Sequence, residues 1–362
     1  MANNPENEFN PDWVPHPGET LRETLEALGM PQAELARRTG RPQKTISGIV
    51  NGTIAITPET ALQFERVTGV PASFWANLQR SYDTFQVRQA EAEELEKWTD
   101  WMHQFPIAEM AKRGWIDRCE DAVEQIRELL NFFGVSNPEA WQTWYERLQE
   151  KEVAYRQSSA TTVDEHALSA WLRQGEVLGV KARTTPYDRG AFKEALQDIR
   201  KLTIEPLPVS RPALEQLCAD CGVAMVFLPA LPNIGTSGAT RWLEPDKALI
   251  QLTLRYKTDD QVWFSFFHEA AHVLEERKTK IVLDAEDRRG DDVEPAEEKA
   301  NRFATDYLIP KEDFRREFGE AGRRRRIGKD QIRRFARKVG VAPGIVVGRL
   351  QHEEMLPWNH CN

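Results

Sequence analysis

The sequence contains no long apolar run, no recognisable secretory leader and few cysteines. No stretch approaches the ~20 consecutive apolar residues of a membrane helix, so we expect no membrane association. The first residues, MANNPENEFNPDW, have neither a basic start nor an apolar core, which argues for a cytoplasmic protein. Four cysteines in 362 residues do not make a disulfide framework, and the CxxC pair Cys218 and Cys221 lacks the second pair of a zinc ribbon.

An overall excess of positive charge is also missing, because 48 Lys and Arg residues stand against 57 Asp and Glu residues. The net charge of −9 does not exclude DNA binding, since basic residues can be concentrated on one face. With 362 residues the chain is long enough for two or three domains. Its patterning predicts a multidomain, mainly α-helical protein with an α+β part.

Four regions follow from this patterning. We expect an all-α helix-turn-helix domain at 10–82, a helical connecting region at 83–205, an α+β domain with a small β-sheet at 206–320 and a basic helical segment at 321–362. Strands are predicted at 223–228, 238–243 and 248–254. The connecting region is rich in tryptophan, for which we expect a role in the core and assign no chemistry.

Three short helices are predicted at the start of the chain, over residues 17–28, 31–39 and 42–50. Proline opens each of them, at a position that helices tolerate, and glycine follows the first two. Ala36 is small enough for a close helix crossing, and Gly40 can adopt the left-handed conformation of a tight turn. The second and third helices therefore form a helix-turn-helix arrangement.

Basic and hydrogen-bonding side chains are concentrated on this arrangement. Residues 31–50 contain four basic residues and one acidic residue, Glu34. We predict that base edges or phosphates of double-stranded DNA are contacted by Arg37, Arg38, Arg41, Gln43, Lys44, Thr45, Ser47 and Asn51.

The same region resembles the Xre-type helix-turn-helix of HigA-like antitoxins. The resemblance is carried by His16-Pro17-Gly18-Glu19, Leu35-Ala36-Arg37, residues 45–52, residues 56–62 and residues 74–79 with Tyr82. It implies DNA binding as a homodimer, often at the protein's own promoter. Gly48 departs from the family, which usually has a longer side chain there, and glycine costs ~1 kcal/mol of helix stability. The alternative is a helical protein-interaction module that no longer binds DNA.

The motif His268-Glu269-Ala270-Ala271-His272 predicts a metal site. Histidines at i and i+4 lie on one face of a helix, so both imidazoles can reach one Zn²⁺ ion. Glu269 is placed to take a proton from the attacking water as the catalytic base.

A third ligand is expected from the helix that starts near Pro295. Glu297 lies on its inward face and is our candidate, whereas Glu298 is rotated by ~100° toward solvent. Asn301, one turn later, can hydrogen-bond a ligating histidine. Candidates for stabilising an oxyanion are Tyr256, Arg349 and His352, each with a structural or exposed role as the alternative.

These motifs resemble the ImmA/IrrE metallopeptidase family. The resemblance is carried by the HEAAH helix, by residues 297–304 and by Leu308-Ile309-Pro310, and it covers about residues 206–320. In that family the Glu four residues before the Asn is the third zinc ligand, in agreement with Glu297. Its members cleave regulatory proteins, typically repressors or antitoxins, in response to a signal.

Two further hypotheses concern partners of this domain. If residues 247–252 form an edge strand, an extended substrate can pair with it. The basic residues between Arg323 and Lys338 indicate a solvated face, with a second DNA contact or an acidic partner as alternatives.

The sequence thus predicts a DNA-binding regulator with zinc-dependent endopeptidase activity that cleaves a repressor or antitoxin. The alternative is a transcriptional repressor or antitoxin of a toxin–antitoxin module. In that case the metal domain acts only in sensing or in binding a partner such as a cognate toxin. An intact Glu269 favours the enzyme.

Overall fold

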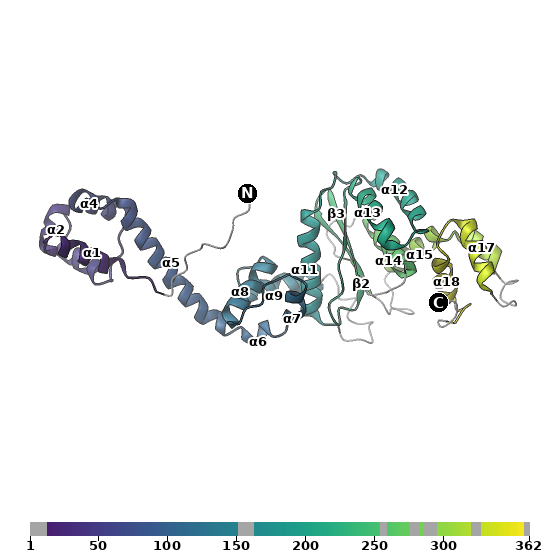
Figure 1. Cartoon of the computed structure of the whole chain (residues 1–362), viewed down its shortest axis with the longest axis horizontal. Coiled ribbons are helices and arrows are strands. Elements are labelled where there is room, and N and C mark those ends of the chain that lie inside the picture. The colour runs from purple at the N-terminus through teal and green to yellow at the C-terminus, as the bar shows by residue number, and fades with distance from the viewer. Residues whose placement is uncertain are drawn as a thin grey trace. The chain divides into compact units, whose positions relative to one another are not determined.

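The structure is a computed structural model, and it describes residues 13–150, 163–253, 259–275, 282–285, 295–319 and 327–357. The chain divides into two compact units, one up to Thr99 and one from Asp100, which are drawn together in Figure 1. Among the described residues, no helix combines the length and the apolar character needed to cross a membrane.

The first unit is a bundle of helices. They are α1 (Pro17–Ala27), α2 (Gln32–Thr39), α3 (Gln43–Val50), α4 (Pro58–Thr68) and α5 (Ala72–Glu96). The predicted helix-turn-helix is confirmed, and Gly40 ends α2 in the left-handed conformation with φ of 71°. The helices bury a core that includes Leu21, Leu35, Ile46, Phe64 and Trp75. The long helix α5 runs through the boundary expected after residue 82.

Close packing of α1 against α3 sets the orientation of α3. A Cβ atom on Gly18 would lie 2.2 Å from the carbonyl oxygen of Ile49 and 2.6 Å from that of Val50. Only glycine therefore allows α1 to approach the backbone of α3 this closely.

The second unit begins with a helical part rich in aromatic residues. Its helices are α6 (Thr99–Met102), α7 (Ile107–Lys112), α8 (Ala122–Phe133), α9 (Pro138–Glu150) and α11 (Glu165–Lys181). Trp101 and Trp141 are buried and pack edge-to-face, with ring centroids 5.6 Å apart. Phe105 joins them, 4.9 Å from Trp101 and 5.2 Å from Trp141. These tryptophans form core, as the helical spacing predicts.

The sheet of the second unit has four strands in the order β1-β3-β2-β4. The strands are β1 (Val223–Phe227), β2 (Thr236–Glu244), β3 (Lys247–Leu252) and β4 (Val282–Ala285). Only β1 and β3 are parallel; β2 is antiparallel to both β3 and β4. The expected small sheet is confirmed, but the hypothesis that 247–252 is an edge strand is wrong. Because β3 lies between β1 and β2, both of its edges are already paired.

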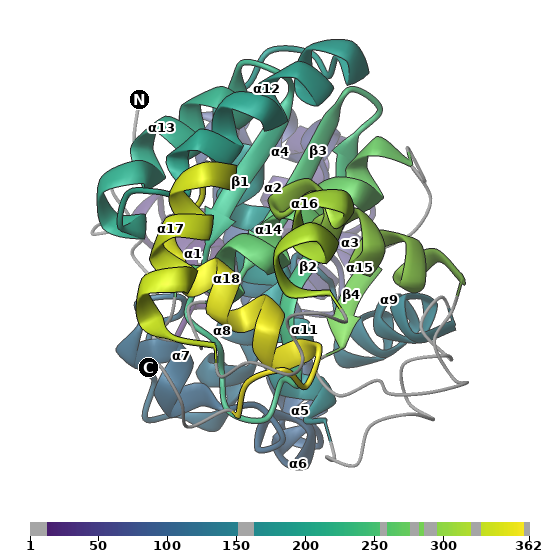
Figure 2. The same cartoon turned by 90° about the vertical axis from the view of Figure 1, so that its right-hand side faces the viewer.

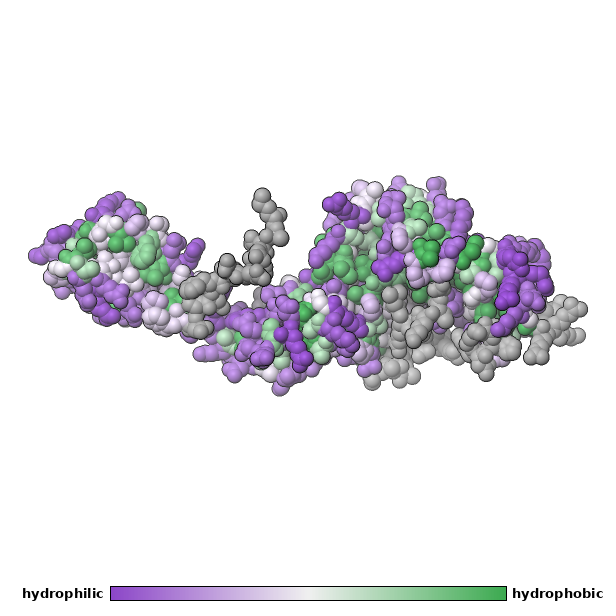
Figure 3. Space-filling model, in the orientation of Figure 1, coloured by the Kyte–Doolittle hydropathy of each residue, from purple (hydrophilic) through white to green (hydrophobic). Residues whose placement is uncertain are grey.

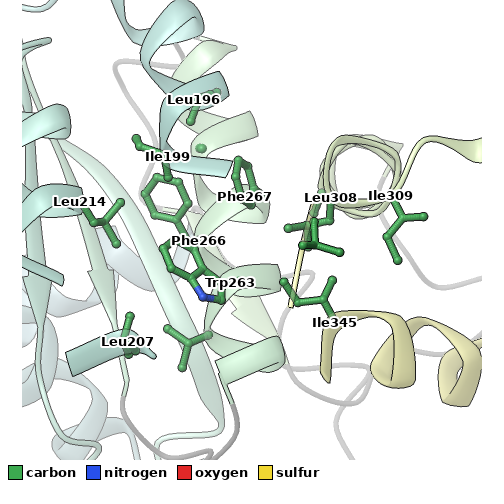
Figure 4. Close-up of a cluster of buried hydrophobic side chains, with 14 of the residues drawn as sticks. Leu196, Ile199, Leu207, Leu214, Trp263, Phe266, Phe267, Leu308, Ile309 and Ile345 are labelled. Carbon is green, nitrogen blue, oxygen red and sulfur yellow. The ribbon is translucent and has the colours of Figure 1, made fainter. Parts of the chain in front are cut away.

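Helices cover both faces of this sheet (Figures 1 and 2). On one face lies α11, whose Gly175 and Trp171 meet the side chain of Gln251 on β3. On the other lie α12 (Arg189–Leu202), α13 (Leu207–Ala219) and α14 (Asp259–Leu274). Figure 4 shows their shared apolar core, in which Trp263, Phe266 and Phe267 of α14 are fully buried.

Four helices complete the second unit: α15 (Pro295–Leu308), α16 (Lys311–Phe318), α17 (Lys329–Val339) and α18 (Pro343–His352). Helix α17 buries Ile332, Phe335 and Ala336 against the core. Its opposite face exposes Lys329, Arg333, Arg334, Arg337 and Lys338. The surface over α17 is accordingly hydrophilic (Figure 3). The basic residues 323–326 lie outside the described residues.

Candidate metal centre and helix-turn-helix surface

The two histidines of the HEAAH motif lie on one side of α14. The helix is held by its apolar residues, so its orientation against the sheet and α15 is fixed by packing. His268 and His272 are both buried, and their Nε2 atoms lie 3.1 Å apart. The i, i+4 spacing thus brings two imidazole nitrogens to one point.

Helix α15 brings Glu297 to the same point. Its Oε2 atom lies 3.2 Å from Nε2 of His268, and its Oε1 atom lies 3.3 Å from Nε2 of His272. The nitrogen and oxygen atoms of the three side chains all lie within 4.8 Å of one another. Glu297 is buried although carboxylates are rarely so, whereas Glu298 is exposed and pairs with Arg302 at 2.6 Å.

These spacings fit a zinc ion. Four ligands at 2.0–2.1 Å in a tetrahedron stand about 3.3 Å from one another. The three separations between the ligand atoms, 3.1, 3.2 and 3.3 Å, match that edge length. Among the described residues, these three side chains would hold the ion, which would leave a fourth position for the water or substrate of a catalytic site.

Asn301 lies next to the cluster, one turn after Glu297 on α15. Its Oδ1 atom is 3.0 Å from Nδ1 of His268. An Nδ1–H donated to this oxygen leaves Nε2 of His268 free of hydrogen and available as a ligand. The amide therefore suits the tautomer that metal binding needs.

Glu269 points toward strand β2. The hydroxyl of Thr240 donates a 2.5 Å hydrogen bond to its Oε2 atom. Gly238 leaves room beside the carboxylate, since a Cβ atom there would lie 2.7 Å from Oε1 of Glu269. Sequence reasoning missed both residues; the only signal was that their strand was predicted to lie in the same domain.

The three oxyanion candidates differ in their surroundings. Tyr256 lies outside the described residues. Arg349 is bonded to Glu353 at 2.9 Å, and its guanidinium stacks 5.0 Å from the ring centroid of Phe314. His352 is exposed at the end of α18. Arg349 thus contacts one carboxylate after its own helix and one aromatic ring on α16.

Helix α3 and its C-cap carry five of the eight residues predicted to contact DNA. Gln43, Lys44 and Asn51 are exposed, and Thr45 and Ser47 are half-buried. Asn51 donates to the hydroxyl of Ser47 over 3.2 Å, so the two side chains are already positioned together.

The arginines of the helix-turn-helix have different roles. Glu34 pairs with Arg38 at 2.7 Å and also with Arg37. The hydrogen bonds from these two guanidinium groups lower the pKa of the Glu34 carboxyl. Both arginines remain exposed. Arg41 is half-buried, donates to Gln63 over 2.5 Å and lies 3.6 Å from Glu59. It ties the turn to α4, a role that the sequence did not reveal.

Comparison with known families gives two matches within the chain. Residues 21–75 match the helix-turn-helix family, and residues 231–351 match the IrrE N-terminal-like domain, which is classed among peptidases. The first match runs from Leu21 within α1 to the start of α5. The second spans the cluster of His268, His272 and Glu297.

Individual relatives are similar to about a fifth of the chain. An uncharacterized HTH-type transcriptional regulator of Escherichia coli is 34% identical over 68 residues, 19% of this chain and 72% of that protein. Antitoxin HigA-1 of Vibrio cholerae is 32% identical over 78 residues, 21% of this chain and 73% of that protein. A HigA-family addiction module antidote protein of Coxiella burnetii has a solved structure that is 36% identical. The matched part covers 23% of this chain and 91% of the Coxiella burnetii chain, with a TM-score of 0.22.

Proposed function

Because the chain belongs to the HigA-like helix-turn-helix proteins and carries an IrrE-like domain at its C-terminus, we propose that it is a DNA-binding regulator with zinc-dependent endopeptidase activity. Its substrate is a regulatory protein, a repressor or an antitoxin. The helix-turn-helix, acting as a homodimer, delivers the peptidase to DNA or to a DNA-bound substrate.

The observation that carries the peptidase proposal is the convergence of His268, His272 and Glu297. Three buried polar side chains from two helices meet at distances that suit a tetrahedral zinc ion. Buried histidine and glutamate side chains are costly unless they are paired or bind a metal. A site of this composition supports metal-assisted hydrolysis.

A bound zinc ion would polarise the scissile carbonyl and make water more acidic. The residues of this chain have separate tasks around it. Glu269 takes the proton of the attacking water and passes it to the leaving amine. Thr240 holds one oxygen of that carboxylate and so restricts its orientation. Asn301 fixes the ring of His268 and its tautomer.

Metal analysis of the purified full-length protein tests the site. We expect about one zinc ion per chain, and close to none in the His268→Ala variant. Glu298→Ala is the matched control, because this neighbouring carboxylate is exposed and should not change the zinc content. Equal zinc in all three proteins, or in none, contradicts the proposed metal centre.

A trapping experiment then tests the activity. The Glu269→Gln variant keeps the three ligands but lacks the base, so it should hold its substrate uncleaved. We expect a partner that is recovered intact with this variant and as fragments with the wild-type protein. A partner recovered intact with both proteins contradicts the endopeptidase.

A second function is favoured by one comparison. The relative from Vibrio cholerae is an antitoxin, and the matched residues cover most of its length. The alternative is therefore a transcriptional repressor or antitoxin whose metal domain binds a cognate toxin or senses a signal. A toxin that is neutralised equally by the wild-type and Glu269→Gln proteins supports this alternative.

A further inference from the structure

Gly48 leaves an opening on the outward face of α3. The residues at 44, 47, 48 and 51 follow helical spacing on this face, and their neighbours Ile46, Ile49 and Val50 are buried on the other. A Cβ atom on Gly48 would lie 2.5 Å from Cδ1 and 2.8 Å from Cγ1 of Ile54. The side chain of Ile54 therefore occupies the place of the missing side chain.

The chain after α3 is held in this position by the backbone of Gly48. Its carbonyl oxygen accepts from the amide of Thr53 at 2.8 Å and from the amide of Ile54 at 3.1 Å. The hydroxyl of Thr53 adds a third bond to the same oxygen, at 3.2 Å. Because three hydrogen bonds converge on this carbonyl oxygen, they hold the backbone of Thr53 and Ile54 against the end of α3.

Ile54 is not part of the core of this unit. Its side chain is 39% exposed, whereas Ile56, two residues later, is 4% exposed and packs inside. It is thus an apolar side chain on a face that otherwise carries Lys44, Ser47 and Asn51.

We infer that Ile54 is a base-reading residue that contacts the C5-methyl group of a thymine in the major groove. The inference rests on the proposed DNA binding through α3. Among the four bases, only thymine offers an apolar group in that groove, and apolar side chains are its partners. The polar neighbours of Ile54 serve phosphates and hydrogen-bonding base edges, so the thymine contact adds sequence information that they do not supply.

The test uses the full-length protein and a duplex that it selects from a randomised DNA library. Each thymine of that duplex is then replaced by deoxyuracil, which removes only the methyl group. We expect one replacement per half-site to weaken wild-type binding by about fourfold, the effect of burying one methyl group. Ile54→Ala removes the contact in both half-sites of a homodimer, so it should bind the thymine duplex about sixteenfold more weakly and should not distinguish the two duplexes.

A matched control is Leu28→Ala, which removes another exposed apolar side chain of the same unit, at the C-terminal end of α1. It should retain wild-type affinity and uracil sensitivity. Wild-type protein that is insensitive to every replacement overturns the inference, as does Ile54→Ala protein that remains sensitive. If the protein selects no duplex at all, both DNA binding and the Ile54–thymine contact are refuted. If it selects a duplex but is insensitive to deoxyuracil, only the contact is refuted.

Discussion

Thr240 on β2 and Glu269 on α14 are joined by a 2.5 Å hydrogen bond between the threonine hydroxyl and Oε2 of the glutamate. This bond links the residue next to a metal-site histidine to a strand of the sheet. Gly238, on the same strand, keeps the space beside the carboxylate open. The position of the proposed base is therefore determined by the sheet as well as by its own helix.

Thr240→Val should weaken catalysis without changing zinc content. It keeps the shape of the side chain but removes the donor, and a hydrogen bond to a charged group is worth about 1.5–3 kcal/mol. The substrate is the partner identified with the Glu269→Gln variant. We expect kcat for its cleavage by Thr240→Val to fall by about tenfold or more, with a smaller change in KM. Thr240→Ser restores the hydroxyl and should restore most of the rate. Equal losses in both variants would assign Thr240 to packing alone.

Asn301→Ala should weaken zinc binding rather than the fold. Its side chain is exposed and touches the cluster through the 3.0 Å contact with Nδ1 of His268. Loss of such a partner of a ligating histidine typically costs 10- to 100-fold in metal affinity. Competition with a chromophoric chelator measures this change, with Glu298→Ala as the control on the same helix. An unchanged affinity would contradict the role of the amide.

Gly175→Ala should destabilise the second unit. A Cβ atom at this position would lie 1.7 Å from Oε1 of Gln251, whose amide nitrogen donates to the carbonyl of Trp171 at 2.7 Å. Overpacking of this kind costs about 1–3 kcal/mol, and loss of the buried hydrogen bond adds to it. Gly328→Ala is the control, since it meets no atom within 4 Å. Chemical denaturation of both variants measures the difference.

The sequence was most informative where the relevant residues share one helix. The spacing of His268 and His272 and the inward face that carries Glu297 follow from helical periodicity. Contacts between distant segments were not predictable in this way. The Thr240–Glu269 bond requires the docking of α14 on β2, and the bond of Arg41 to Gln63 requires the docking of α4.

Strand order was missed for the same reason. The three strand segments could be recognised from their apolar residues, but such runs do not encode which neighbours they have. Residues 247–252 pair with β1 on one side and β2 on the other, so no edge is left for a substrate. The sequence indicated that Gly48 removes one possible DNA contact. The packing of Ile54 against Gly48 was not predictable, because it depends on the path of the turn that follows α3.

His166 should make the stability of the second unit depend on pH. Its ring stacks on Trp141 with centroids 5.1 Å apart and meets the edge of Phe105 at 4.8 Å. Burial lowers the pKa of His166 below the ordinary histidine value of about 6.5, against the opposing effect of the negative charge of Asp164. The folded protein therefore holds the neutral ring, and the unfolded chain binds the proton more readily.

The sign of the effect follows from proton linkage. Since the unfolded state binds more protons near and below pH 6.5, the free energy of unfolding should fall as the pH drops through that value. His166→Phe keeps an aromatic ring in the cluster and removes this proton, so its stability should fall less between pH 7.5 and pH 5.5. Urea denaturation of both proteins at constant ionic strength gives the difference, in which the titration of all other groups cancels. An identical loss in the two proteins would mean that protonation of this ring does not contribute.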